Sequence, residues 1–513
     1  MMKRILCAMM ILCLMAALSG CSRERAEREE SVPAMPAPRV EYDAPDGDSY
    51  AGEGKMYTLY LPGKNGLYLL AQHVNMGPGT RNELLVALVS ELLSYPANER
   101  VDSLGGEVSL SLYGPNPVEL SGGVCTVNLG SSALGLSYRN IYTVALAVAA
   151  TLCEVENIRC VNILVADQSV ALDVTGNLAM GSLVPHPGEN LPVLWEQMDA
   201  KKTPLGADPA QTPMTAYLTI YYPLENGQGV SCESRTLTFQ GQTPAQMTSG
   251  ILETISNGPM YLTGVPDLPD LGNMLTRPPL TSDLPDGGRM ITLSFREDAM
   301  EIWRESGVDP ACLAAAVTFS LTTFIPGTAA VSFRIGEKPL TALSSEKFGE
   351  IPVLGGLMRR EQLEPLLMDR VTVFFQRGGV LVPCEKAVDR DLTDSPREQL
   401  IALIDGPGAR ERADGLMPTL PDLVNEEDIL GVARVGDTML VNLSESFRAE
   451  IQSWGKEGET LLCYSMVNTL CENNGVRRVI FFFEGEQVDE ICGVICWSGT
   501  FDYNTGLCEK SFG

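Results

Sequence analysis

One pattern constrains this 513-residue chain more than any other: the same order of predicted elements occurs three times. Each copy opens with a strand rich in β-branched and aromatic residues, and these strands begin at Tyr57, Ala216 and Val371. The repeat length of about 157 residues is typical of one domain. The chain is therefore expected to fold as three copies of one unit.

A helix with a marked start follows each opening strand. Each start has a hydroxyl residue followed three positions later by Glu or Gln: Thr80 and Glu83, Thr243 and Gln246, Ser395 and Glu398. This is the capping box, in which the two side chains satisfy amides of the first helical turn. Each helix ends before a proline, which cannot continue it: Pro96, Pro259 and Pro407. Three boxes in matching positions argue against chance.

The remainder of the unit is a variable loop, a glycine turn with a middle strand, a second helix and a last strand. The turn and middle strand are expected at residues 122–129, 287–295 and 436–443. The second helix is expected at 141–154, 310–324 and 460–473, and the last strand at 160–165, 330–335 and 479–483. The last strand is apolar on both faces, which indicates a central position in a sheet. The predicted fold class is α+β, with three β-α-β-α-β modules, each a small sheet with two helices on one face.

The N-terminus has the features of a lipoprotein signal. Lys3 and Arg4 precede an apolar run at residues 5–18, which is shorter than the roughly 20 residues needed to span a bilayer. The following Leu-Ser-Gly-Cys sequence, which ends at Cys21, resembles the lipobox of bacterial lipoproteins. Residues 1–20 are therefore predicted to be a signal peptide cleaved after Gly20. The lipid on Cys21, with acyl chains such as palmitate, would hold the protein on the extracytoplasmic side of the cell membrane.

The composition also predicts the domain boundaries. Residues 21–50 are charged and proline-rich with few large apolar side chains, and this composition predicts a disordered tether. The three modules are expected at residues 51–185, 213–343 and 369–513. The linkers between them, near residues 185–213 and 344–367, are rich in proline, glycine and charge.

The chain is strongly acidic. Its formal net charge is −28, and loss of residues 1–20, which hold two basic and no acidic residues, changes it to −30. Such a surface repels the phosphates of nucleic acids and anionic lipid headgroups. We therefore expect no nucleic-acid partner, and we expect the lipid alone to hold the protein at the membrane.

Eleven cysteines follow Cys21, an odd number for a secreted protein. Most of them lie in apolar runs, as Cys125 does, and are predicted to be buried free thiols. Cys492, Cys496 and Cys508 are the best candidates for a disulfide. The spacing of Cys492 and Cys496 is only weak evidence for a metal or redox site.

The sequence offers no strong catalytic motif. Ser344 and Lys347 match the S-x-x-K pattern of penicillin-recognising enzymes, but the companion motifs are missing. The two histidines, His73 and His186, are expected on the surface or in turns. The acidic residues of the second module lack the regular spacing of a calcium loop: Asp267, Asp270, Asp283 and Asp286. No catalytic, cofactor-binding or metal-binding residue is predicted, and Phe482 is an interface candidate only if it is exposed.

The third unit resembles the GerMN domain, the sporulation and spore germination domain of Gram-positive lipoproteins. The resemblance rests on four segments: residues 371–375 with 381–383, Ser395-Pro396 with 403–407, residues 440–444 before Phe447, and 467–470 with 476–479. Asn442 stands where aspartate is usual. The first unit matches through residues 124–129 and Thr151-Leu152, and the second through Thr322-Thr323 and an approximate strand at residues 293–295.

The resemblance implies a membrane-tethered, non-enzymatic protein whose modules are similar to the ring-building modules of secretion systems and sporulation channels. A well-known relative carries two such domains, so three would be a departure. The leading hypothesis is an interaction or assembly scaffold at the cell surface, in sporulation or germination, which binds a protein partner or itself. One alternative is a lipoprotein that binds a ligand or the cell wall through the variable loops at residues 97–122, 260–286 and 409–435. The other alternative is a cell-wall hydrolase, which requires two close carboxylates in a cleft.

Overall fold

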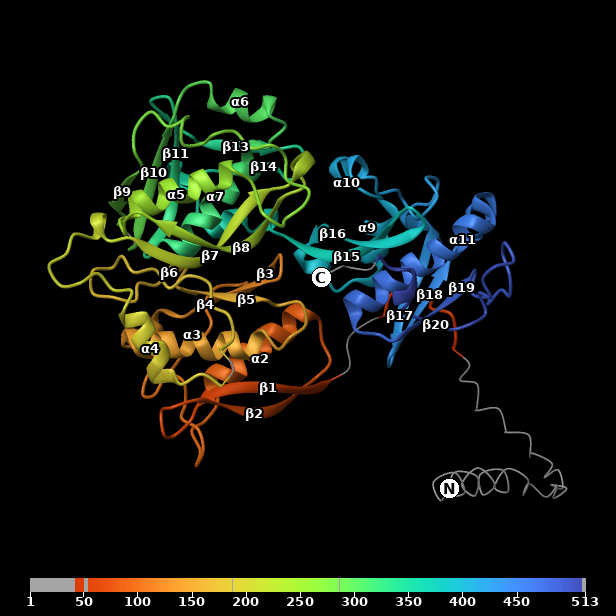
Figure 1. The fold of residues 1–513 in the computed structure, drawn as a ribbon, viewed down its shortest axis with the longest axis horizontal. Helices are drawn as coiled ribbons and strands as arrows, with labels where there is room; N and C mark the ends of the chain where they lie inside the picture. The colour runs from red at the N-terminus through yellow and green to blue at the C-terminus, as the bar shows by residue number, and fades with distance from the viewer. Residues whose placement is uncertain (1–41, 50–53, 187, 286, 510–513) are drawn as a thin grey trace, which may run out of the picture. The chain divides into compact units, whose positions relative to one another are not determined.

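The computed structural model describes residues 42–49, 54–186, 188–285 and 287–509 (Figure 1). The predicted signal peptide, the predicted lipid site Cys21 and most of the predicted tether lie outside the described residues. The three modules belong to one compact unit that begins at Ala44.

Each module consists of a β-hairpin, two principal helices and a four-stranded sheet. The first contains β1 (Lys55–Pro62), β2 (Leu69–Met76), α2 (Arg81–Ser94), β3 (Val118–Ser121), β4 (Val124–Leu129), α3 (Tyr138–Leu152), β5 (Cys160–Val165) and β6 (Gln168–Ser169). The second contains β7 (Met214–Pro223), β8 (Val230–Phe239), α5 (Pro244–Ser256), β9 (Leu280–Asp283), β10 (Arg289–Phe295), α6 (Ala299–Glu305), α7 (Pro310–Phe324), β11 (Thr328–Ile335) and β12 (Lys338–Pro339). The third contains β15 (Met368–Arg377), β16 (Val380–Asp389), α9 (Pro396–Ile404), α10 (Ala409–Ala413), β17 (Ile429–Val435), β18 (Thr438–Leu443), α11 (Glu445–Asn474), β19 (Arg478–Phe483) and β20 (Phe501–Asp502).

The three sheets share one topology. Their strand orders are β3-β4-β5-β6, β9-β10-β11-β12 and β17-β18-β19-β20. In each, the two central strands are parallel and each edge strand is antiparallel to its neighbour. The predicted middle and last strands are these central pairs, which a helix connects as parallel pairing requires. The repeated α+β fold predicted from the sequence is confirmed.

The opening strand of each module differs from the prediction, because it does not join the four-stranded sheet. It pairs with the strand that follows it, as β1-β2, β7-β8 and β15-β16. The second long helix contacts both the hairpin and the sheet: α3 contacts β1 and β5, α7 contacts β7 and β11, and α11 contacts β15 and β19. Each module therefore has three layers, with the helices between a hairpin and a sheet (Figure 1). The helices still cover one face of the sheet.

The three helix starts have the predicted hydroxyl caps, and the first has the complete capping box. The side chain of Thr80 accepts a hydrogen bond from the amide of Glu83, and the Glu83 carboxylate accepts one from the amide of Thr80. Thr243 and Ser395 likewise accept bonds from the amides three residues later. The long helix α11 is interrupted at Gly455, which has a φ of 72°. Its second half contains the predicted helix at residues 460–473.

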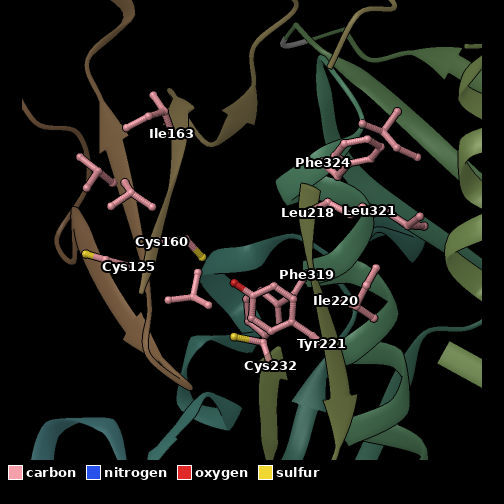
Figure 2. Packing of buried hydrophobic residues seen from close by; sticks show 14 of the residues in the cluster. Cys125, Cys160, Ile163, Leu218, Ile220, Tyr221, Cys232, Phe319, Leu321 and Phe324 are labelled. Carbon is pink, nitrogen blue, oxygen red and sulfur yellow. The ribbon is translucent and has the colours of Figure 1, made fainter. Parts of the chain in front are cut away.

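The first two modules share one hydrophobic core, whereas the third has a core of its own. All six residues of β4 are buried, because α3 and the hairpin of the second module cover opposite faces of the first sheet. Figure 2 shows β7 with Leu218, Ile220 and Tyr221 between strands of the first module and α7. The ring centroids of Tyr221 and Phe319 lie 5.3 Å apart there.

The two predicted linkers are ordered connectors. The first contains α4 (Leu191–Asp199), in which the indole of Trp195 donates a 3.0 Å hydrogen bond to Thr143 Oγ1 of α3. The second contains the hairpin β13-β14 (Ala342–Ser345, Gly349–Pro352) and the short helix α8 (Arg360–Leu363). Both connectors therefore pack on the modules that they join.

Among the described residues, no single helix is both long and apolar enough to span a membrane. The bent pair of α6 and α7 passes that test by length and composition. Every residue of α7 is buried in the shared core of the first two modules. Its apolar composition is explained by that position.

Candidate interaction surfaces

The matching edges of the three sheets have different surroundings. An edge strand presents unpaired amides and carbonyls, which makes it a template for another strand. β3 contacts β15 of the third module, and β9 is exposed at all four of its residues. β17 is covered by residues 44–49, which we call the strap. The strap falls in the segment predicted as disordered tether, so that prediction is wrong for these residues.

The strap pairs with the backbone of β17. The amide of Ser49 donates to the carbonyl of Val432 at 2.9 Å, and the amide of Arg434 donates to the carbonyl of Ser49 at 2.8 Å. The amide of Val432 donates to Oδ1 of Asp48 at 3.0 Å. Ser49 and Ala433 thus form an isolated parallel bridge at the β17 edge of the third sheet.

Two side chains of the third module hold the strap. Arg397 donates from Nε to Oδ2 of Asp48 at 2.7 Å and from Nη2 to Oδ1 at 3.1 Å, a bidentate charge-assisted pair. The side-chain amide of Asn442 donates from Nδ2 to the carbonyl of Pro45 at 3.1 Å. Its Oδ1 accepts a hydrogen bond from the backbone amide of Gly485 at 3.0 Å. An aspartate at position 442 has no proton to donate to that carbonyl when ionised. The asparagine noted in the sequence therefore has a structural role here.

A buried polar network joins the first sheet to the hairpin of the second module. Asn162 on β5 donates to Thr219 on β7 at 3.1 Å and accepts from Ser182 at 2.7 Å. The hydroxyl oxygens of Ser182 and Thr219 are 2.8 Å apart, and the hydroxyl oxygen of Thr219 lies 2.9 Å from that of Ser234 on β8. Because a buried polar group without a partner is costly, this network favours one register between the two modules.

The third module contacts the first near two carboxyls, the buried Asp369 and the half-buried Asp394. The carboxylate of Asp394 accepts a hydrogen bond from the amide of Arg81, at the start of α2. Burial raises the pKa of Asp394, although the hydrogen bond from the Arg81 amide and the Arg81 charge oppose the shift. Burial also raises the pKa of Asp369, although Arg81 opposes the shift. These carboxyls are committed to a junction between modules and to capping a helix.

Two cavities lie away from the variable loops that the sequence offered as a binding site. A cavity of about 380 Å³ between the first connector and β7 is lined mainly by apolar residues, among them Tyr142, Met180, Met198 and Met214. A cavity of about 250 Å³ is lined by side chains that include Tyr60. None of the three variable loops contributes to either cavity. A cavity of about 340 Å³ is lined in part by residues of the first variable loop.

The S-x-x-K match lies in the hairpin of the second connector. Ser344 is exposed on β13, away from any helix start, and the ammonium group of Lys347 donates to the carbonyl of Gln228 at 3.2 Å. His73 is exposed on β2, as predicted. His186 lies in the first connector, where Nδ1 is 3.5 Å from Oε2 of Glu189.

The described cysteines are free, and most are buried, as the apolar runs predicted. The candidate disulfide among the three C-terminal cysteines is not formed, and only Cys496 of these is exposed. Burial raises the pKa of Cys232 to about 12. Such thiols lack the thiolate needed for nucleophilic chemistry at neutral pH.

Phe482 is buried, so it is a core residue rather than an interface residue. The carboxylate of Asp270 accepts bonds from Asn273, and Asp283 ends β9. Asp286 lies outside the described residues. Within the described part of the chain, no group of three or more His, Cys, Asp or Glu side chains is arranged to hold a metal ion.

Sequence reasoning missed the contact between Asp48 and Arg397. No local pattern links an aspartate in a proline-rich segment to an arginine 349 positions later. The one indication in the sequence was Asn442, which has a side-chain amide at a position where the GerMN family usually has an aspartate.

Comparison with known proteins places the third module in a family. Residues 372–489 match the family model described as Germane, sporulation and spore germination. No curated protein matches the chain.

Three solved structures are similar at low identity. The tandem GerMN domains of the sporulation protein GerM from Bacillus subtilis share 19% identity over 58% of this chain and 96% of that one, with a TM-score of 0.23. The first GerMN domain of the same protein shares 16% identity over 26% of this chain and 96% of that one, with a TM-score of 0.20. A candidate lipoprotein from Clostridium perfringens shares 19% identity over 26% of this chain and 87% of that one, with a TM-score of 0.19. At these values the likenesses are not evidence of function.

The family match covers β18 and β19, the long helix between them and most of the hairpin β15-β16. The third module of this chain is therefore a GerMN domain of the sporulation and spore germination family.

Proposed function

We propose that this protein is a membrane-anchored extracytoplasmic lipoprotein that acts as a non-enzymatic assembly scaffold in sporulation or germination. The observation that carries the proposal is the stacking of modules, in which the hairpin of the second module covers the sheet of the first. The polar groups buried at this junction, such as Asn162 and Thr219, bond to each other across it. A unit that buries its sheet against the next unit is suited to building larger assemblies from like parts.

The absence of enzymatic activity is part of the proposal. Asp369 and Asp394, the carboxyls with raised pKa values at the junction between the first and third modules, line two different cavities, and the Asp394 carboxylate is bonded to the amide of Arg81. We expect the purified full chain to release no fragments from peptidoglycan of its own host. Release of fragments that depends on two carboxylates would instead support the hydrolase alternative.

The anchoring part is tested in the host cell. The lipidated protein is expected in the membrane fraction and in the detergent phase, with its N-terminus at Cys21 after cleavage. A Cys21→Ser variant is the matched control, and it should lose the lipid and leave the detergent phase. If both forms partition alike, the lipid anchor is wrong.

The scaffold part is tested by cross-linking the lipidated protein in its own membrane, followed by mass spectrometry of the products. Products that contain a second copy or a defined surface protein are expected. A chain that remains uncross-linked at native abundance, while a known membrane complex is captured in parallel, would contradict the scaffold role.

A second candidate function, the binding of an apolar ligand, is favoured by the cavity of about 380 Å³ beside β7. Its lining of methionines is adaptable and suits an apolar molecule. Native mass spectrometry of the full chain tests this candidate. A retained small molecule that is lost in an Ala216→Trp variant, which fills the cavity, would support it.

A further inference from the structure

β17 has the properties of an edge strand that would pair with another strand if it were left uncovered. It is seven residues long, and apart from Arg434 its side chains are uncharged. Natural edge strands are usually short or carry charges and prolines that prevent pairing with another chain. The exposed edge β9 follows that rule, since it has four residues and ends in Asp283. Without the strap, β17 would present an apolar template for pairing.

The site on β17 recognises particular features of the strap. Arg397 bonds both oxygens of the Asp48 carboxylate, so it selects an acidic residue at that point. Asn442 selects a backbone carbonyl, and Gly431 allows the strap to approach closely. A Cβ atom at position 431 would lie 2.6 Å from the carbonyl oxygen of Pro45, closer than such contacts occur. Site and strap are therefore complementary in shape, charge and hydrogen bonding.

We propose that β17, Arg397 and Asn442 form a strand-accepting site through which two copies of this chain join, with residues 44–49 of one copy filling the site of the other. Each copy carries both the segment and the site, so exchange between copies re-forms the same bonds and needs no new surface. Holding copies on one membrane raises their effective concentration for each other, so that exchange between chains can compete with the bond within one chain. This inference rests on the proposed scaffold function and names the surface that performs it.

Two complementary variants of the full chain test the proposal. The first, Arg397→Ala with Asn442→Asp, keeps the strap and loses the site. The second, Asp48→Ala with Ser49→Pro, keeps the site and loses the strap, since proline has no amide to donate to Val432. With different affinity tags, the two are co-expressed, purified through both tags and sized by analytical ultracentrifugation.

Each variant alone is expected to be monomeric, and the pair is expected to form a one-to-one dimer. Addition of Arg397→Ala to the second variant should reduce dimer recovery at least tenfold. A mixture that stays monomeric overturns the proposal. Dimers formed by the second variant alone would also overturn it, because β17 would then pair with itself.

A disulfide trap gives an independent readout if one of these variants does not fold. Ser49→Cys with Ala433→Cys places thiols on two residues that are bridge partners, and Ser49→Cys alone is the matched control. Oxidation on the membrane should give covalent dimers specific to the double variant. A cross-link confined to single chains at every surface density contradicts strap exchange. If wild-type protein is nevertheless cross-linked to other partners, the scaffold function stands and only this site is wrong.

Discussion

Nη2 of Arg360 lies 2.6 Å from Oε2 of Glu119, although 241 positions separate the two residues. Arg360 belongs to the second connector and Glu119 to β3 of the first module, and both are buried. Arg360 also donates to Thr323 Oγ1 of α7 at 2.7 Å, and its guanidinium lies 4.8 Å from the ring centroid of Phe319. One side chain therefore joins the connector to the first and second modules.

Breaking this ion pair from one side is expected to be costly. Glu119→Leu leaves the Arg360 guanidinium buried without its counter-ion, and loss of one partner of a buried pair typically costs about 3–5 kcal/mol. Replacing both, with Glu119→Leu and Arg360→Met, removes both charges and should cost less than Glu119→Leu alone. Urea unfolding of the four members of the double-mutant cycle measures the difference.

The matched control for that cycle is the more exposed pair of Arg139 and Asp199, in which Nη2 of the arginine lies 2.6 Å from Oδ2 of the aspartate. Exposed pairs contribute at most about 1 kcal/mol, so Arg139→Ala should have a small effect. Equal losses at the buried and exposed pairs would show that the junction does not depend on Arg360.

The cap of α2 is expected to contribute measurably to stability. Thr80→Ala removes the acceptor for the amide of Glu83, and loss of an N-cap side chain costs about 1 kcal/mol. Thr80→Ser keeps the hydroxyl and should stay close to the wild type. Urea unfolding monitored by circular dichroism provides the comparison, and a Thr80→Ser loss equal to that of Thr80→Ala would contradict the role of the hydroxyl.

The junction between the first and third modules is expected to respond to pH through Asp369. Burial raises the pKa of Asp369 in the folded protein, so the folded state binds that proton more tightly than the unfolded chain does. The carboxyl therefore stabilises the fold below its ordinary pKa, and this contribution is lost as the pH rises through the folded-state pKa. An Asp369→Asn variant should gain stability relative to the wild type between about pH 4 and pH 7. Thermal unfolding across that range tests the direction, and a difference independent of pH would contradict it.

The thiols are expected to differ sharply in reactivity. Cys496 is exposed, whereas Cys125 and Cys232 are buried. Burial raises the pKa of Cys232 to about 12, so its thiolate is scarce at neutral pH. Brief treatment with N-ethylmaleimide should modify Cys496 first, and the buried thiols only after unfolding in urea. Peptide mapping identifies the sites, and a Cys496→Ser variant should lose the early modification. Equal labelling of Cys232 in the folded protein would contradict its burial.

The hairpin β15-β16 has a local signal in the sequence at its turn. β15 and β16 are joined by Gly378 and Gly379, which both have positive φ, at 61° and 85°. Two consecutive glycines between apolar runs are typical of a two-residue hairpin turn. The opening strand can pair with its immediate neighbour at low entropic cost, because the loop is short. That local pairing explains why the opening strand does not join the four-stranded sheet.

The amino-acid sequence by itself determined the order of the elements, the helix starts at Thr80, Thr243 and Ser395, and the threefold repeat. Those features depend on neighbours within a few residues, so capping, periodicity and turn chemistry are enough to reveal them. Only the tertiary structure decided that the first two modules share a core, that Arg360 pairs with Glu119, and that Asp48 binds Arg397. These contacts join residues hundreds of positions apart, and their partners are selected by shape, burial and charge after the modules have folded.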